Sequence, residues 1–554
     1  MMTDATINTV TISKADIPSG GMKSYKQEDD SIILITRDDD EFRAFDGKCP
    51  HAGADLGNGL RCGNRVVCPW HHATFDSRDG TLLEPIATKG LTQYELTHDG
   101  DNLTVDTSAQ VTGQVTGQVE NDKLTDTHTI IVGGGGAGFM TADQLRQGGY
   151  GGKITLISKE DKAPYNRPLL SKAFLAGKMD EDKLLLGGVD WADNNNIELR
   201  LNQTVSEVLP NEATVVIEDN DGNSERQTAD FLVVATGAKP NLPPITGAEI
   251  DGVYTLRSMS DAKLIKAASH DQRVVIIGTG FIGMETASAL AQAGTTASIT
   301  VIGQGSRVMG NIVSETVSNA LIKLHEEKGI NFVFDATVNE ITKVDRQMDK
   351  DGDNNNQAFS NVGGVTLANG EHIDADIVIL GTGVSPRTEI LSEVNDPDGV
   401  QVDAHLQLRD GVYALGDIAK ASNQMGRMRI EHWRVALQHG IVTAAAILND
   451  DSVDSLEARI PFFWTMQYGK SLRYSGHAET PDHNILLGTP DTHDYIEYYF
   501  DDEGEDTRAS AASTLGRDKE LVAFSELLRR GHTPTRAQLN AGFDIIEQAH
   551  ALSR

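Results

Sequence analysis

All three cysteines of this 554-residue chain lie in the short stretch 48–75, together with three of its sixteen histidines. The pattern is Cys49-x-His51, then sixteen residues, then Cys68-x-x-His71, so each of two segments contributes one thiolate and one imidazole. A structural zinc site usually takes its cysteines from one segment and its histidines from the other. The mixed pattern suits a [2Fe-2S] cluster, in which one iron binds both thiolates and the other both imidazoles. These four residues are therefore predicted to hold a one-electron redox centre.

Two neighbouring residues of similar chemistry are not predicted to be ligands. Cys62 is the only other cysteine of the chain and has no unpaired partner, so we expect a small buried residue. His72 follows His71, but the C-x-x-H spacing selects His71, and His72 is expected beside the cluster or at the surface. Two histidine ligands raise the cluster potential into a range of about −150 to +300 mV. Such a centre needs another group that loads it with single electrons.

Two glycine-rich turns predict that group. Residues 128–144 (HTIIVGGGGAGFMTADQ) and 272–290 (QRVVIIGTGFIGMETASAL) both read as a strand, a Gly-x-Gly-x-x-Gly turn and a helix. The glycines are Gly133, Gly135 and Gly138 in the first turn and Gly278, Gly280 and Gly283 in the second. In such turns the pyrophosphate of a dinucleotide rests on the helix N-terminus. Two units in one chain favour an enzyme that uses both a flavin and a nicotinamide.

The expected ribose partners differ between the two turns. Glu160 lies twenty-two residues after Gly138, near the position where an acidic side chain binds a ribose diol. In the second unit Gly303 occupies the corresponding position, and Arg307 beyond it could meet a 2′-phosphate or serve only as a loop-end arginine. The choice between NADH and NADPH therefore stays open.

Composition narrows the class of protein. The formal charge of −33 disfavours binding to nucleic acid, whose phosphates would be repelled. No apolar run reaches the roughly eighteen residues of a membrane helix, and the N-terminus does not read as a signal peptide. With only three cysteines, a reduced cytoplasm is the expected compartment. The segment 349–357 (DKDGDNNNQ) departs from a calcium loop in the places of its glycine and glutamate, so an acidic hairpin is expected there.

Six further segments resemble one family and stand in its order. They are APYNRPLLSK (163–172), VVATGAKP (233–240), GTGVSPRTEIL (381–391), GVYALGDIA (411–419), IEHWRVALQHG (430–440) and PFFWTMQYGKSLRYSGHA (461–478). With the cluster motif, they resemble the apoptosis-inducing-factor-like proteins and the ferredoxin reductases of oxygenase systems. The version with a fused N-terminal Rieske domain is the most similar, and the resemblance covers essentially the whole chain.

The resemblance implies a multidomain fold with two Rossmann-like α/β domains between a β domain and an α+β domain. The predicted divisions are an all-β Rieske domain (1–105), a linker (106–126), a discontinuous FAD domain (127–250 and 378–452), an inserted NAD(P) domain (251–377) and a C-terminal interface domain (453–554). The oligomeric state is not predicted.

The resemblance also implies which residues surround FAD and NAD(P)H. They are Arg167, Lys172, Val205, Thr236, Gly237, Glu285, Asp417, Glu431, Trp433 and Trp464. Asp417 would accept a hydrogen bond from the ribityl chain, and Arg167 and Lys172 would stabilise the reduced ring. Glu285 and Glu431 would flank the nicotinamide–flavin stack, and the two tryptophans would cover it. The Thr–Gly pair would lie at the domain crossing, and the valine backbone would contact adenine.

The implied activity is electron transfer from NAD(P)H through FAD and the cluster to an acceptor such as a ferredoxin, a cytochrome or an oxygenase component. The family resemblance places His51 and His71 at an exposed tip facing that acceptor. Because no cysteine follows Cys68, reduction of a disulfide through a cysteine pair is excluded. Two alternatives stay open: an NAD(P)H oxidase whose cluster is fed from outside, and a redox-sensing scaffold.

Overall fold

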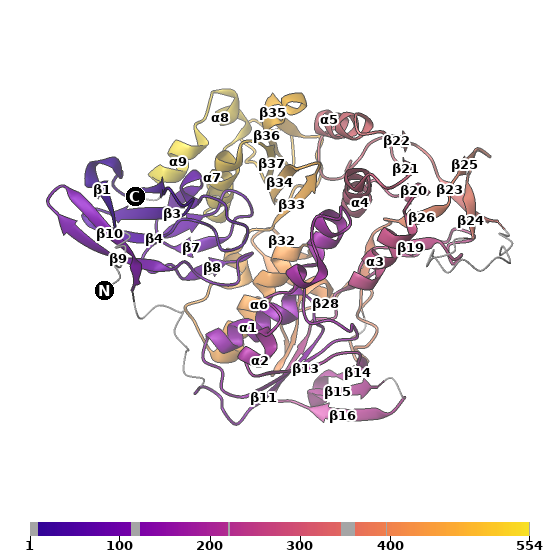
Figure 1. Ribbon diagram of the computed structural model, residues 1–554, viewed down its shortest axis with the longest axis horizontal. Coiled ribbons are helices and arrows are strands. Elements are labelled where there is room, and N and C mark those ends of the chain that lie inside the picture. The colour runs from indigo at the N-terminus through magenta and orange to yellow at the C-terminus, as the bar shows by residue number, and fades with distance from the viewer. Residues whose placement is uncertain (1–8, 112–121, 220–221, 345–360, 395, 553–554) are drawn as a thin grey trace, which may run out of the picture.

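The computed structural model describes residues 9–111, 122–219, 222–344, 361–394 and 396–552. The segment 349–357, predicted as an acidic hairpin, lies outside them. Figure 1 shows the N-terminal β strands beside the C-terminal helices, while the strands of the second nucleotide-binding unit lie at the opposite end of the molecule. Within the described residues no helix combines the length and the apolar character that crossing a membrane requires.

The N-terminal domain is all β, as predicted. Its larger antiparallel sheet has the order β1-β10-β9-β4-β3-β2 and its smaller one the order β5-β6-β7-β8. The strands are β1 Thr9–Ser13, β2 Met22–Lys26, β3 Ile32–Asp38, β4 Glu41–Asp46, β5 Leu60–Cys62, β6 Arg65–Val67, β7 Thr74–Asp76, β8 Leu82–Glu84, β9 Gln93–Asp99 and β10 Asn102–Gln110. Strand β10 pairs with β1 and β9 and continues to Gln110, so the linker predicted from residue 106 starts too early.

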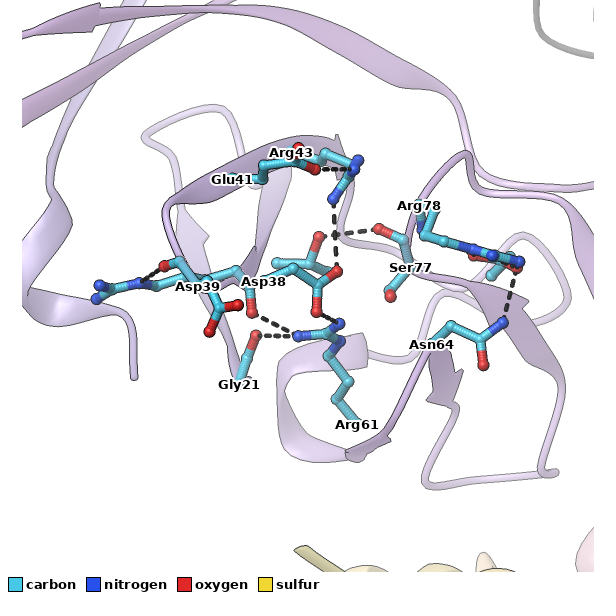
Figure 2. Close-up of polar contacts among 12 residues, drawn as sticks. Gly21, Asp38, Asp39, Glu41, Arg43, Arg61, Asn64, Ser77 and Arg78 are labelled. Carbon is cyan, nitrogen blue, oxygen red and sulfur yellow. Dashed lines mark hydrogen bonds and ion pairs between the residues drawn. The ribbon is translucent and has the colours of Figure 1, made fainter. Parts of the chain in front are cut away.

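A buried arginine ties the two sheets of this domain together. Arg61 of β5 forms an ion pair with Asp38 and donates to the backbone oxygen of Gly21 (Figure 2). Between the same two sheets, Thr36 donates to the Ser77 carbonyl. Only 2 % of the Arg61 side chain is exposed. Because a buried charge is costly to leave unpaired, these bonds fix the cluster-bearing sheet to the rest of its domain.

The first nucleotide-binding unit is a mostly parallel sheet of order β13-β12-β11-β17-β30-β29, whose last pair is antiparallel. Its elements are β11 His128–Val132, α1 Gly136–Gln147, β12 Lys153–Ile157, α2 Trp191–Asn194, β13 Ile197–Arg200, β17 Phe231–Val234, β29 Gln407–Arg409, β30 Val412–Ala414 and α6 Trp433–Leu448. The strands come from two separate parts of the chain because the second unit is inserted between them.

The second unit is a parallel sheet of order β19-β26-β20-β21-β22. Its elements are β19 Val253–Thr255, α3 Met259–Ala268, β20 Arg273–Ile277, α4 Phe281–Ala293, β21 Ser298–Ile302, α5 Glu315–Glu326, β22 Ile330–Val333 and β26 Ile377–Leu380. The predicted boundary between residues 377 and 378 is misplaced, because it cuts through β26, which pairs with β20 along its whole length.

Smaller sheets complete the two units. They are β14 Thr204–Leu209 with β15 Thr214–Glu218 and β16 Ser224–Thr228; β18 Ala238–Pro240 with β27 Val384–Pro386; β23 Val338–Lys343 with β24 Val362–Leu367 and β25 His372–Asp374; and β28 Val400–Gln401 with β31 Ala419–Asn423 and β32 Gly426–Arg429. The pair β18 and β27 forms an antiparallel ribbon where the chain enters and leaves the inserted unit.

The C-terminal domain is α+β, as predicted. Its antiparallel sheet has the order β33-β34-β37-β36-β35. The elements are β33 Phe462–Gln467, β34 Lys470–Gly476, β35 Asn484–Thr489, β36 Asp494–Tyr499, β37 Ala511–Leu515, α7 Asp518–Arg529, α8 Arg536–Asn540 and α9 Ile545–Ala551. Helices α7 and α9 lie against the N-terminal domain in Figure 1, and the Cys62 thiol donates to the Ala549 carbonyl of α9.

Candidate functional site

The two predicted ligand segments fold into loops of the same shape, here called loop 1 (48–55) and loop 2 (68–73). In loop 1 the amide of Cys49 donates to Ala54 O at 2.8 Å, and in loop 2 that of Cys68 donates to Ala73 O at 2.9 Å. Four residues after each cysteine the backbone turns left-handed, at Gly53 with φ +75° and at His72 with φ +55°. Both loops are therefore closed in the same way, although the histidine follows the cysteine by two residues in loop 1 and by three in loop 2.

Like residues from the two loops face each other. The Cys49 and Cys68 thiols share a hydrogen bond, and backbone N–H groups of the following residues point at both sulfurs. The rings of His51 and His71 lie 4.7 Å apart, centre to centre. Within the described part of the chain, no three His, Cys, Asp or Glu side chains gather as a single ion would require. One pair of thiols and one pair of imidazoles match a cluster of two irons, each of which takes two protein ligands.

The histidine atoms fit this cluster. Within the described structure, Nδ1 of His51 and Nδ1 of His71 are buried and have no hydrogen-bond partner, a state that buried polar atoms rarely adopt without a ligand. Burial lowers the pKa of His51 to about 4 and that of His71 well below its ordinary value. Both imidazoles are therefore neutral at pH 7, which is the form that binds a metal.

Both cluster histidines are partly exposed, but His71 does not form the free tip that the resemblance implied, because another domain covers it on one side. The ring of His71 packs edge-on against Trp464 of β33, with ring centres 4.6 Å apart. A further ring beside His71, that of Trp70, is 40 % exposed and lies 6.5 Å away, centre to centre. His72 is buried and stacks on Phe462 at 4.1 Å, so it lies beside the cluster and not at the surface. Cys62 is buried, as predicted.

Trp464 also lines a cavity of about 230 Å³ between the two nucleotide-binding units. Nine of the residues implied by the glycine motif or by the resemblance line it: Gly135, Arg167, Lys172, Gly237, Glu285, Asp417, Glu431, Trp433 and Trp464. The cavity is bordered by the N-termini of helices α1 and α4 and by strand β33. It therefore lies where two dinucleotides bound to the two turns would meet.

The first glycine turn is tightly packed at two of its glycines and open at the third. Gly133 has φ +117°, and a Cβ there would lie 2.2 Å from Ala235 O. A Cβ on Gly138 would lie 2.1 Å from Gly133 O. At Gly135, the N-cap of α1, a Cβ would meet no atom within 4 Å. Two glycines thus close the turn, and the third opens a cradle at the helix N-terminus that suits a pyrophosphate.

The second turn repeats this geometry. Gly278 has φ +119°, a Cβ on Gly283 would lie 2.0 Å from Gly278 O, and Gly280 is the open N-cap of α4. Gly303 follows β21, where a Cβ would crowd Thr279 at 2.7 Å. Arg307 donates to Gly310 O and to Asp482 at 3.0 Å, so its guanidinium is already paired with the C-terminal domain.

Buried charges face the cavity in pairs. Lys172 binds Glu285 at 2.7 Å, and less than a tenth of either side chain is exposed. Asp417 binds Arg257 at 2.8 Å. Arg257 was not predicted, because no motif marks it. Glu431 pairs with Arg429. The lining thus carries both signs of charge beside its aromatic walls.

Three predicted residues, Glu160, Val205 and Thr236, are not among those that line the cavity. Glu160 accepts hydrogen bonds from Tyr165 and Arg167, so its carboxylate is engaged within the protein. Val205 is buried in β14 and is not part of the cavity lining. Thr236 donates to the Arg387 carbonyl at 2.8 Å, which fits its predicted place at the crossing between the two units.

The aromatic lining contains further residues that the sequence did not single out. Trp433 covers the start of α1, since a Cβ on Gly136 would lie 2.8 Å from its ring. Phe463 packs against Phe281 and His432. Within the described residues Nδ1 of His432 is buried without a partner, and burial lowers the pKa of this residue to about 4. His432 lies between two predicted residues, in the quoted segment 430–440, and its neighbours were the available signal.

The two nucleotide-binding units and the Rieske-type loop pair define a two-nucleotide oxidoreductase fold, and known proteins share it. The model of the pyridine nucleotide-disulphide oxidoreductases matches residues 127–440, that of the Rieske [2Fe-2S] domain residues 8–95, and that of the reductase C-terminal domain residues 462–545. The chain belongs to the pyridine nucleotide-disulphide oxidoreductase family. Its cofactors are FAD and a [2Fe-2S] cluster, with NAD(P)H as co-substrate.

Relatives align with different shares of this chain. Human apoptosis-inducing factor 3 is 27 % identical over 534 residues, covering 93 % of this chain and 83 % of the relative. The rubredoxin-NAD(+) reductase of Pseudomonas putida is 34 % identical over 367 residues, or 64 % of this chain and 88 % of its own. A crystal structure of the covalent putidaredoxin reductase–putidaredoxin complex matches with a TM-score of 0.68 at 27 % identity, covering 77 % of this chain and 99 % of that one.

Proposed function

We propose that this chain transfers electrons from NAD(P)H through FAD to its own cluster, and that Cys49, His51, Cys68 and His71 hold this cluster. The observation that carries the proposal is the position of Trp464, which contacts the His71 ring and lines the cavity between the nucleotide turns. The predicted cluster site and the predicted flavin site are thus separated by one side chain. When bound there, FAD would supply the change from two-electron hydride chemistry to single-electron transfer.

The chain's own residues bind and orient the nucleotides in this proposal. The open glycine cradles at Gly135 and Gly280 bind the two pyrophosphates. Arg167 and Lys172 supply positive charge beside the flavin, and Asp417, held by Arg257, accepts from its ribityl hydroxyls. Trp433 and Phe463 line the walls and exclude water, which strengthens the electrostatic contacts inside.

Coenzyme choice depends on the region after β21. With Gly303 there is no carboxylate at the usual ribose position, and a carboxylate there is what repels a 2′-phosphate. Arg307 is paired with Asp482 and would have to leave it to bind such a phosphate. We therefore propose that both coenzymes are used and that neither is strongly preferred.

The acceptor is proposed to be a small one-electron carrier protein that docks at Trp70. This side chain is the exposed neighbour of a cluster histidine, whereas the other side of His71 is covered by Trp464. Because the chain carries a formal charge of −33, a carrier with a basic face would be attracted to it. The cytoplasm is the proposed compartment.

Anaerobic reduction tests the proposal. The holoenzyme is titrated with NADH and, separately, with NADPH, and frozen samples are examined by electron paramagnetic resonance. A reduced Rieske signal that appears with either nucleotide is the expected result. Flavin bleaching with the cluster still oxidised at the end of the titration would refute the proposed electron path.

A further inference from the structure

Around the cluster loops, the apolar core of the Rieske domain is continuous with the cores of its neighbours. Cys49, Cys68 and Phe75 belong to one continuous buried cluster with Phe139 and Leu437 of the first nucleotide-binding unit. Leu60 and Cys62 belong to another, with Phe462 and Phe524 of the C-terminal domain. Domains joined by a linker are expected to move relative to each other unless their interface is large and apolar. This interface is continuous with the core on both sides.

A buried carboxylate of the Rieske domain lies at the centre of this interface. Glu84, at the end of β8, accepts from Gln438 at 2.8 Å and pairs with Arg459 at 3.0 Å and Arg434 at 3.4 Å. About 5 % or less of each charged side chain is exposed. Burial alone would raise the pKa of Glu84, but Arg459, Arg434 and Arg65 hold it below its ordinary value. The carboxylate is therefore charged and faces two cations from beyond its own domain.

Arg434 extends this contact to the cluster loop itself. Its guanidinium donates to Pro85 O at 2.9 Å, to His72 O at 3.1 Å and to Ile460 O at 3.0 Å. It follows Trp433 directly, at the start of α6, and lines the cavity. One side chain thus spans from the cavity wall to the backbone of loop 2.

The conformation of His72 agrees with this arrangement. A residue with φ +55° is more easily glycine, and loop 1 has Gly53 at the corresponding position. In loop 2 the place holds a histidine whose ring stacks on Phe462 of the C-terminal domain. A left-handed backbone is unfavourable for histidine, and the stacking of its ring on another domain offsets this cost.

We infer that Glu84, Arg434 and His72 are positioning residues that fix loop 2 over the cavity, so that the Rieske domain works as a fixed relay and does not swing between the flavin and the acceptor. The inference rests on the proposed function for its kinetic meaning, but the fixed position is measurable without it. Buried ion pairs add little net stability over apolar replacements, so their use here agrees with a demand for defined geometry.

The test compares Glu84→Gln in the holoenzyme with wild type and with Arg43→Met, which breaks ion pairs with Glu41 and Asp38 inside the same domain (Figure 2). Hydrogen–deuterium exchange of residues 66–88 reports the position of loop 2, and anaerobic mixing with NADH reports electron transfer. Glu84→Gln should exchange at least about tenfold faster in this segment and reduce the cluster at least about tenfold more slowly. The flavin should still bleach at the wild-type rate, and dithionite should give an unchanged cluster spectrum. Arg43→Met should match wild type.

Two further variants keep the inference falsifiable if Glu84→Gln folds poorly. Glu84→Gln/Arg459→Met restores the charge balance and should recover part of the exchange protection. His72→Gly relaxes the backbone but should still expose loop 2 to exchange, because the stack on Phe462 is lost. Wild-type exchange in all three variants would overturn the fixed relay, as would expansion of the wild-type protein on reduction, measured by X-ray scattering. A wild-type cluster that never accepts electrons from NADH, with loop 2 still protected, would refute the proposed function alone.

Discussion

The two cluster loops have the same internal geometry but very different surroundings. In the described structure, the hydrogen bonds of loop 1 stay within the Rieske domain, for example from Gly53 to Cys49 and from Ser24 to Asp55. Loop 2 is held from outside, because Arg473 donates to its Trp70 carbonyl and Arg434 to its His72 carbonyl. Its histidine also contacts Trp464.

This difference indicates that the two loops have partly different roles. Both loops are built to hold the cluster, since each supplies one thiolate and one imidazole. Only loop 2 is built to connect the cluster with the reductase, through His71 on one side and the carbonyl groups on the other. Electrons from the flavin are therefore expected to enter through loop 2, and variants of the two loops should separate ligand effects from connection effects.

The largest effect should be the same for both loops. Replacing a thiolate ligand, as in Cys49→Ser or Cys68→Ser, should abolish the cluster, because a serine oxygen is a poor substitute for a soft thiolate. Iron analysis of the purified protein should fall from about two atoms per chain to near zero. Retention of a normal cluster in either variant would show that the assigned ligand set is wrong.

The next effect should belong to loop 2 alone. Arg473→Met removes the donor to Trp70 O and leaves the half-buried Asp518 without its partner. The free energy of unfolding should fall by about 3 kcal/mol, measured by urea denaturation of the holoenzyme. Lys48→Met in loop 1 is the matched control and should stay within about 0.5 kcal/mol of wild type. Equal losses in both variants would remove the proposed asymmetry.

A smaller, kinetic effect is expected at Trp464. Trp464→Leu removes the ring between His71 and the cavity and should slow cluster reduction after NADH mixing by about tenfold. Phe463→Leu is the control, since Phe463 lines the same cavity from the same strand but packs against Tyr474 and Phe281. If both variants slow cluster reduction equally, the effect comes from the cavity and not from the contact with loop 2.

The smallest effect is expected at the exposed side of loop 2. Trp70→Ala should lower kcat/KM for a basic one-electron acceptor such as cytochrome c by about threefold, the size of one contact at the rim of an interface. Reduction of the cluster by NADH should not change. If the cluster were reduced more slowly by NADH while kcat/KM for the acceptor stayed normal, Trp70 would belong to the path by which electrons reach the cluster.

Motifs within short segments could be predicted from the sequence, whereas contacts between domains could not. The six glycines could be predicted because a tight turn and an open helix N-terminus demand glycine at fixed spacing. The cluster residues could be predicted because a Rieske-type centre needs two cysteines for one iron and two histidines for the other. The orientation of the histidines could not, since Trp464 lies almost 400 residues after His71 and nothing in loop 2 indicates its partner.

The same limit applies to the charged groups. Glu84 belongs to no motif, and its partners Arg434 and Arg459 are about 350 and 375 residues away. Glu160 stands near the expected distance from its glycine turn, but the nearby Tyr165 and Arg167 occupy its carboxylate. Spacing along the chain identified this acidic side chain, whereas its partners depend on the fold.

The central claim is that electrons pass from the nicotinamide through the flavin into a cluster fixed beside it. Anaerobic rapid mixing of the wild-type holoenzyme with NADH tests this most directly, with flavin absorbance followed in time and the cluster followed by paramagnetic resonance of rapidly frozen samples. The account predicts flavin bleaching first and cluster reduction within the same turnover, at a rate that does not depend on protein concentration. A cluster that stays oxidised, or one whose reduction rate rises with protein concentration, would contradict it.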